Sequence, residues 1–142
     1  MSTQPSSTDA PRPALYGLPC ADVMERPACV IERYATCAEA LQAMAQSRSR
    51  YAAVASNGVL AGMVTIADFA RLRGRDPADI CVSAIMTHAR DLTTLAPQTM
   101  VLDALRLLDE DGYHQLPVIS GGRKLEGFIT RETLMSLQPC RK

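Results

Sequence analysis

The fold is decided by the stretch Gly62-Met63-Val64-Thr65-Ile66-Ala67-Asp68-Phe69, in which a short apolar strand gives way to an amphipathic segment at Thr65. The pattern returns 65 residues later as Gly127-Phe128-Ile129-Thr130-Arg131-Glu132-Thr133-Leu134, with the glycine, the apolar pair and the threonine at the same spacing. A strand-to-helix junction that recurs with its neighbours indicates an internal repeat. We therefore interpret the chain as two copies of one unit.

The first junction has two interpretations. A threonine at the end of a strand caps the helix that follows it, and Asp68, three residues after Thr65, can accept a hydrogen bond from the Thr65 amide. Alternatively, the positive end of a helix attracts a phosphate, and a fixed carboxylate beside it accepts both hydroxyls of a ribose. The three fixed residues alone favour the cap, and only the repeat favours a nucleotide.

The composition restricts the class of protein. A chain of 142 residues fits one domain or two small halves that share a core, because about 60 residues bury too little surface to be stable alone. The hydrophobic content of 47% without tryptophan indicates a globular protein with an aliphatic core. Lys plus Arg and Asp plus Glu both total 15, so no field of one sign favours nucleic acid as a direct partner.

The sequence also bears on location and redox chemistry. No apolar run approaches the roughly 20 residues that span a bilayer, and the first residues lack a signal peptide, so we expect no membrane insertion and a cytoplasmic protein. The cysteines show no C-x-x-C spacing, which predicts reduced thiols, several in the core, with a redox or metal site as the alternative. The five are Cys20, Cys29, Cys37, Cys81 and Cys140.

The domain organisation follows from the repeat. Residues 1–14 are rich in Ser, Thr and Pro and are predicted to be a flexible tail. The first unit is predicted over residues 15–75, the second over 76–138, and a short C-terminal tail over 139–142.

Each unit opens with a short helical turn and then runs strand, helix, strand, strand, helix. An Asn57-Gly58 pair between apolar runs predicts the first hairpin, and a Thr36 to Glu39 capping box predicts the first helix. The first unit has its opening turn at 19–24, strands at 28–31, 51–55 and 59–64, and helices from 36 and from 65 to about 73. The second has its turn at 81–86, strands at 91–95, 115–119 and 125–129, and helices from about 99 and from 130 to about 137.

Several motifs occur in the same order in both copies. They are Asp22-Val23-Met24, Thr36 to Ala40 and Gly62 to Asp68 in the first copy, and Ala84-Ile85-Met86, Met100 to Ala104, Leu116-Pro117-Val118 and Gly127 to Thr130 in the second. Together they resemble the CBS domain pair, or Bateman module, over residues 20–138. The resemblance implies an α+β fold of two tandem β-α-β-β-α units packed as a pseudo-twofold pair, whose clefts in many relatives hold AMP, ADP, ATP or S-adenosylmethionine.

The resemblance also implies roles for residues of the junctions. It places Thr65 near the phosphates and Asp68 on the ribose, and Thr130 matches Thr65. Thr133 stands where the family has Asp, and one hydroxyl cannot accept both protons of a diol. We therefore expect one nucleotide per chain, with preference for the junction that contains Asp68.

Two basic residues occupy matching places before the middle strand of each unit. Arg50 precedes Tyr51 and His114 precedes Gln115, where some relatives put a basic side chain on a phosphate; the alternative is an exposed or locally hydrogen-bonded side chain. The complete set of candidate ligand-binding residues is Gly62, Thr65, Asp68, Arg50, Thr36, Thr130, Arg131 and His114. No catalytic set and no metal-ligand set is recognised.

These expectations combine into a function. The chain is expected to be a regulatory module that binds an adenosine nucleotide in the cleft between the CBS units and modulates an unidentified effector protein, without catalysis and without a required cofactor. Apolar helix faces left uncovered by so small a module favour a homodimer. A ligand-free dimerisation or interaction module is the alternative, and an oxidation sensor that acts through the thiols is a third.

Overall fold

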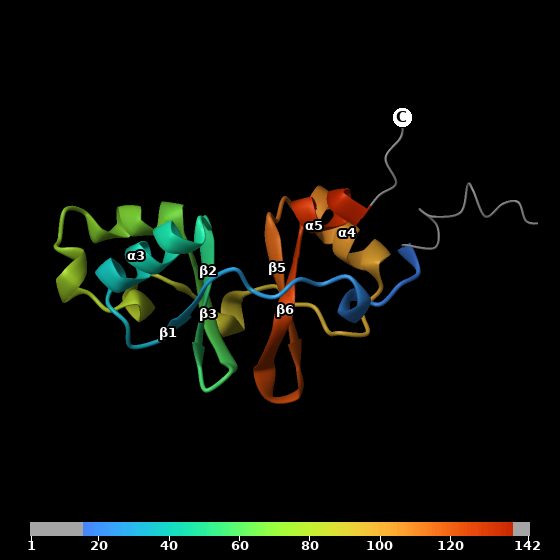
Figure 1. Ribbon diagram of the computed structural model, residues 1–142, viewed down its shortest axis with the longest axis horizontal. Helices are drawn as coiled ribbons and strands as arrows, with labels where there is room; N and C mark the ends of the chain where they lie inside the picture. Colours follow the sequence, from blue (N-terminus) through green and yellow to red (C-terminus); the bar gives the residue numbers. More distant parts are fainter. Residues whose placement is uncertain (1–15, 138–142) are drawn as a thin grey trace, which may run out of the picture. The chain divides into compact units, whose positions relative to one another are not determined.

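The computed structural model describes residues 16–137, which form two compact units (Figure 1). One comprises residues 27–93 and 121–125 and is called here the Asp68 unit; the other comprises residues 16–26, 94–120 and 126–137 and is called the Thr133 unit. The tails predicted over 1–14 and 139–142 lie outside the described residues. Both units mix helices with strands, which confirms the α+β class.

In the Asp68 unit, a small sheet has its strands in the order β1 (Val30–Glu32), β2 (Tyr51–Ser56), β3 (Val59–Thr65) and β4 (Thr87–His88). β2 runs parallel to β1 and antiparallel to β3, and β4 pairs antiparallel with the other edge of β3. The other elements are α3 (Cys37–Ser47) and the short 3₁₀ helices η2 (Ile66–Leu72), η3 (Pro77–Asp79), η4 (Val82–Ala84), η5 (Ala89–Asp91) and η6 (Gly121–Arg123).

Local chemistry explains these elements. The Glu39 amide donates to Thr36 Oγ1 at 3.1 Å and the Thr36 amide donates to Glu39 Oε1 at 2.8 Å, which completes the predicted capping box of α3. Asn57 and Gly58 have φ of 54° and 80°, as a type I′ turn between β2 and β3 requires. The first closing helix is η2, a 3₁₀ helix, and Arg73 ends it in the left-handed region at φ 52°.

The Thr133 unit has counterparts of η4, α3, β2, β3 and η2, and the strand predicted as the counterpart of β1 is the exception among the predicted elements. The counterparts are η1 (Cys20–Asp22), α4 (Val101–Glu110), β5 (Gln115–Ser120), β6 (Lys124–Thr130), whose first two residues belong to the Asp68 unit, and α5 (Arg131–Leu137). Figure 1 shows α4 and α5 beside one another next to the β5–β6 hairpin.

The exception is the strand predicted over residues 91–95, which is wrong. Residues 89–91 form η5, and only Leu95 pairs, as an isolated bridge to Val118. Its amide donates to the Pro117 carbonyl and its carbonyl accepts from the Ile119 amide, each at 2.8 Å. Pairing stops there because Pro97 has no N–H to offer two residues later.

Each opening turn packs in the compact unit formed mainly by the other sequence repeat. The turn predicted over residues 19–24 packs in the Thr133 unit, and the turn predicted over residues 81–86 packs in the Asp68 unit. Cys20 and Val23 lie in the core of the Thr133 unit, with Val101, Leu108 and Ile129. The corresponding residues Val82, Ile85 and Met86 lie in the core of the Asp68 unit, with Met44, Val54 and Val64. Each compact unit therefore combines most of one sequence repeat with the opening turn of the other. The boundaries 15–75 and 76–138 describe the two sequence repeats, and they stay a prediction.

Candidate ligand site at the two strand-to-helix junctions

The Asp68 junction lies where β3 ends and η2 begins. The Thr65 amide donates to Asp68 Oδ2 at 2.8 Å, and the Thr65 hydroxyl donates to the same oxygen at 3.4 Å. Both side chains are half-buried. Within the described residues no hydrogen bond ends on Oδ1, so the carboxylate keeps acceptor capacity for another donor.

Two other candidate residues belong to this junction through the backbone. The Ile66 amide donates to the Arg50 carbonyl at 3.0 Å, which brings Arg50 next to the start of η2, with its side chain exposed. Gly62 lies opposite β4, where a Cβ would stand 2.4 Å from the Thr87 carbonyl oxygen and 2.8 Å from Met86 Sδ. Gly62 therefore acts through close packing of the two strands.

Thr36 is placed apart from this group. Its hydroxyl accepts the Glu39 amide at the start of α3, and its backbone bridges to Cys81. No hydrogen bond between described residues joins Thr36 to Thr65 or Asp68.

The Thr133 junction lies where β6 ends and α5 begins. The Thr133 amide donates to Thr130 Oγ1 at 3.0 Å, the Thr130 amide donates to Thr133 Oγ1 at 3.3 Å, and the two hydroxyl oxygens are 2.8 Å apart. Thr130 and Thr133 are only 8% and 1% exposed. Threonine thus completes here, by reciprocal bonds, the cap that Asp68 makes in the other unit.

A residue that sequence reasoning missed also lies at this junction. The Thr133 hydroxyl donates to Glu25 Oε1 at 3.2 Å, across 108 positions of the chain. The only signal in the sequence is that Glu25 directly follows the opening turn at Met24. The pairing of Glu25 with Phe128 is what brings it to the junction.

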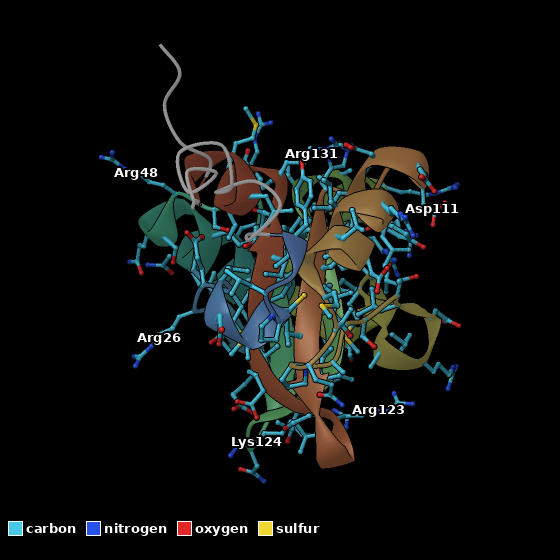
Figure 2. All side chains as sticks on the ribbon, turned by 90° about the vertical axis from the view of Figure 1, so that its right-hand side faces the viewer. Arg26, Arg48, Asp111, Arg123, Lys124 and Arg131 are labelled. Carbon is cyan, nitrogen blue, oxygen red and sulfur yellow. The ribbon has the colours of Figure 1, made fainter. Side chains whose placement is uncertain are left out.

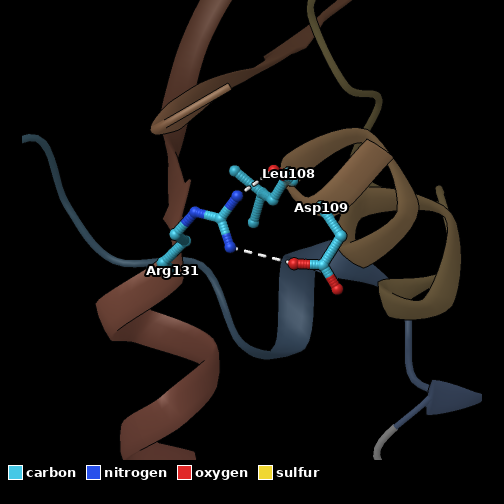
Figure 3. A network of polar contacts seen from close by, with 3 residues as sticks. All are labelled: Leu108, Asp109 and Arg131. Atoms are coloured by element: carbon cyan, nitrogen blue, oxygen red, sulfur yellow. Dashed lines mark hydrogen bonds and ion pairs between the residues drawn. The ribbon is translucent and has the colours of Figure 1, made fainter. Parts of the chain in front are cut away.

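The remaining candidates of the Thr133 unit face other partners. Arg131 donates through one guanidinium nitrogen to Asp109 Oδ1 at 2.9 Å and through the other to the Leu108 carbonyl, so its side chain binds the C-terminal end of α4 (Figure 3). His114 is exposed immediately before β5. Of the charged side chains labelled in Figure 2, Arg26, Arg48 and Asp111 point away from the ribbon.

Burial makes three thiols poor nucleophiles. It raises the pKa of Cys20 to about 11, with the Asp103 carboxylate adding to the effect. Burial also raises the pKa of Cys29 and of Cys37 above the usual 9.0. Because the thiolate is the reactive form, these three residues do not support an oxidation sensor. Across residues 16–137 no three His, Cys, Asp or Glu side chains are grouped to hold a metal ion.

Two α+β units with matching strand-to-helix junctions define a tandem-repeat module. The model of the CBS domain family matches residues 20–75 and again residues 82–139. The chain belongs to the CBS domain family and is a tandem CBS pair, which is a regulatory module, and no catalytic family is indicated.

Known proteins agree with this assignment. The CBS domain of a CBS domain containing membrane protein from Sphaerobacter thermophilus superposes with a TM-score of 0.75, at 24% identity, over 94% of this chain and 96% of that one. CBSX2, a protein of Arabidopsis thaliana, has a structure in complex with AMP that superposes with a TM-score of 0.71, at 24% identity, over 84% of this chain and 95% of that one. At these identities the likeness shows the fold.

The curated relative is longer than the matched region. The uncharacterized protein MJ0188 of Methanocaldococcus jannaschii is 28% identical over 85 residues, which are 60% of this chain and 31% of that protein. The match thus spans about a third of the relative's length. Over residues 16–137, none of the helices is both long enough and apolar enough to cross a membrane.

Proposed function

We propose that this CBS pair senses an adenine nucleotide and changes the activity or assembly of an effector protein in the cytoplasm. The observation that carries the proposal is the Asp68 carboxylate, which the Thr65 amide holds at 2.8 Å through Oδ2 while Oδ1 keeps its acceptor capacity. A carboxylate fixed in this way suits a ribose diol, because it accepts two hydrogen bonds from neighbouring hydroxyls. The AMP complex of CBSX2 supports this ligand class.

The candidate residues divide by the part of the ligand that each would meet. We assign the ribose to Asp68 and the phosphate to Thr65, whose amide donates to Asp68, and to the exposed Arg50, whose carbonyl accepts from the Ile66 amide. The exposed His114 is the corresponding base of the other unit. Thr130, Thr36 and Arg131 stay in the proposed set, although each has a structural partner of its own.

Titration calorimetry tests the proposal directly. The purified chain is titrated with AMP, ADP, ATP and S-adenosylmethionine, and we expect saturable heat from at least one of them. Mass spectrometry of the protein as purified shows whether an adenosine compound is already bound. Absence of heat at millimolar ligand, together with no bound adenosine compound, would refute the proposal.

A second candidate is a ligand-free module that only dimerises or presents a surface to another protein. Exposed apolar side chains on the closing helices favour it: Ile66 on η2 is 50% exposed and Met135 on α5 is 71% exposed. In such a module a partner protein would cover these side chains and remove their apolar surface from water. A dimer without any nucleotide binding would favour this candidate.

A further inference from the structure

At the Thr133 junction, the hydroxyl groups of Thr130 and Thr133 donate their hydrogen bonds in one direction along a chain. The Thr133 hydroxyl has one hydrogen, which goes to Glu25 Oε1 at 3.2 Å. In the 2.8 Å contact between the two hydroxyls, Thr130 is therefore the donor and Thr133 the acceptor. The chain of donors runs from Thr130 through Thr133 to Glu25, so it ends on a carboxylate.

Glu25 occupies a defined place in the repeat. It pairs with Phe128, the second residue of the Thr133 unit's Gly-x-x-Thr motif. In the Asp68 unit the partner of the corresponding residue, Met63, is Thr87. Glu25 and Thr87 are thus equivalent positions, each opposite the strand that ends at its own junction.

The two junctions therefore carry the same pair of groups in exchanged positions. The Asp68 unit has its carboxylate on the closing helix, at Asp68, and a hydroxyl on the opposite strand, at Thr87. The Thr133 unit has its hydroxyl on the closing helix, at Thr133, and a carboxylate on the opposite segment, at Glu25. A carboxylate that is missing at one position is present at the other.

The backbone holds Glu25 firmly in this position. The Glu25 amide donates to the Phe128 carbonyl at 3.0 Å, and the Phe128 amide donates to the Glu25 carbonyl at 2.8 Å. A Cβ at Gly127 would lie 2.8 Å from the Glu25 carbonyl oxygen, so this close approach requires glycine. Glu25 itself is exposed, and among the described residues no hydrogen bond reaches its Oε2.

We propose that Glu25 is the diol-binding carboxylate of the Thr133 junction, and that this junction therefore takes the ribose of a second adenine nucleotide. The inference rests on the proposed function. It replaces the expectation of one nucleotide per chain, which considered only the residue at the helix position. Glu25 accepts the Thr133 hydroxyl on Oε1 and offers Oε2 to the ribose, as Asp68 offers Oδ1.

The test is a titration of the full chain with AMP and with 2′,3′-dideoxy-AMP, which lacks the diol. The variants are Glu25→Gln, Asp68→Asn and, as a matched control, Glu110→Gln, which removes an exposed carboxylate of the same unit. Each variant is first checked by thermal unfolding. Glutamine keeps the size of Glu25 and an acceptor for Thr133, so the fold is expected to survive.

We expect wild type to bind two AMP per chain. Glu25→Gln should weaken one of the two sites by about tenfold or more, the loss of one charge-assisted hydrogen bond, and leave the other unchanged. Asp68→Asn should weaken the other site, and Glu110→Gln neither. With 2′,3′-dideoxy-AMP the difference between wild type and Glu25→Gln should disappear, because the bond in question is made to the diol.

Three outcomes would overturn the inference. If wild type binds one AMP, Asp68→Asn weakens that site and Glu25→Gln does not, then Glu25 holds no ligand while the proposed function stands. If Glu25→Gln weakens AMP and the dideoxy analogue equally, Glu25 supports the junction only structurally. If wild type binds no AMP at millimolar concentration, the proposed function loses its support for this ligand and the inference falls with it.

Discussion

Asp68 has a structural role and a proposed binding role, and a substitution separates them. Asp68→Ala removes the acceptor of two charge-assisted bonds to a ribose, so affinity for AMP should fall by about tenfold to several thousand-fold. It also removes the acceptor of the Thr65 amide, which should cost about 1 kcal/mol of unfolding free energy. Calorimetry and urea unfolding measure the two effects.

Asp79→Ala is the matched control for Asp68→Ala, because Asp79 is an exposed carboxylate of the same unit. It should bind AMP as wild type does. Unchanged affinity in folded Asp68→Ala would return the junction to the simpler interpretation of a helix cap.

Cys20 predicts a dependence of stability on pH. Its pKa is about 11 in the folded protein against 9.0 for an ordinary thiol, because burial disfavours the thiolate. Below pH 9.0 both states keep the proton and stability is unaffected; between pH 9.0 and about 11 the unfolded state loses it first and stability falls. The loss should approach roughly 3 kcal/mol at the upper end of this range.

Urea unfolding at about pH 8, below the pKa of an ordinary thiol, and at about pH 10.5, above that pKa, measures this loss. Cys20→Ala is the control. Other groups titrate in both wild type and Cys20→Ala. The change in unfolding free energy between the two pH values is therefore compared for the two proteins, and the difference is due to Cys20. Equal changes in the two proteins would show that Cys20 is more accessible to solvent than its burial indicates.

At the residue scale, the sequence predicts what local spacing determines. Thr65 and Asp68 are three positions apart, and their contact follows from the geometry of a helix start. Glu25 and Thr133 are 108 positions apart, and their contact depends on the opening turn packing in the unit of the other repeat. No local pattern contains that information, so the second carboxylate was not predicted.

At the element scale, the pairing of β3 with β4 depends on Gly62. In Gly62→Ala the new Cβ would lie 2.4 Å from the Thr87 carbonyl, a backbone atom that cannot turn away. β4 has to shift from β3, and we expect a loss of about 1–3 kcal/mol or more in unfolding free energy. Urea unfolding measures it.

Gly121→Ala is the control, because nothing lies within 4 Å of its new Cβ and its φ is not positive. Its stability should stay within about 0.5 kcal/mol of wild type. If both variants were equally stable, β4 would be free to move and Gly62 would not be needed for close packing.

The same scale shows which elements the sequence could predict. Capping residues and the Asn57-Gly58 turn predicted α3 and the β2–β3 hairpin, because their chemistry is local. The strand over 91–95 is predicted from its place in the repeat, but the strand pairing of the first unit does not recur in the second. Only Leu95 pairs, as an isolated bridge to Val118, and Pro97 follows two residues later.

At the scale of the whole molecule, exposed side chains on the closing helices favour a homodimer. Met135 is 71% exposed on α5. If this helix forms the contact, Met135→Asp should shift the protein from dimer to monomer in light scattering, because an unpaired carboxylate is costly in an apolar interface. Met100→Asp, at a 50% exposed methionine outside the closing helices, should leave the dimer intact. A monomeric wild type at micromolar concentration would exclude the dimer.

The composition of the two compact units makes a last prediction about folding. A fragment of residues 15–75 contains one complete sequence repeat but lacks β4 and the core residues Val82, Ile85 and Met86. A fragment of residues 27–93 contains these and lacks only residues 121–125 of the Asp68 unit. In the fragment of residues 15–75, Gly62 would also lose its partner strand β4, so this edge of β3 would be left unpaired.

We therefore expect the fragment of residues 27–93 to show native-like circular dichroism and cooperative urea unfolding, although with low stability, because units of this size bury little surface. The fragment of residues 15–75 should unfold without a cooperative transition, since its opening turn finds no core and its own core lacks three buried side chains. Equal cooperativity in both fragments would mean that the sequence repeat, and not the compact unit, is what folds. Cooperative unfolding of the 27–93 fragment alone would show that the exchanged opening turn is an integral part of the domain.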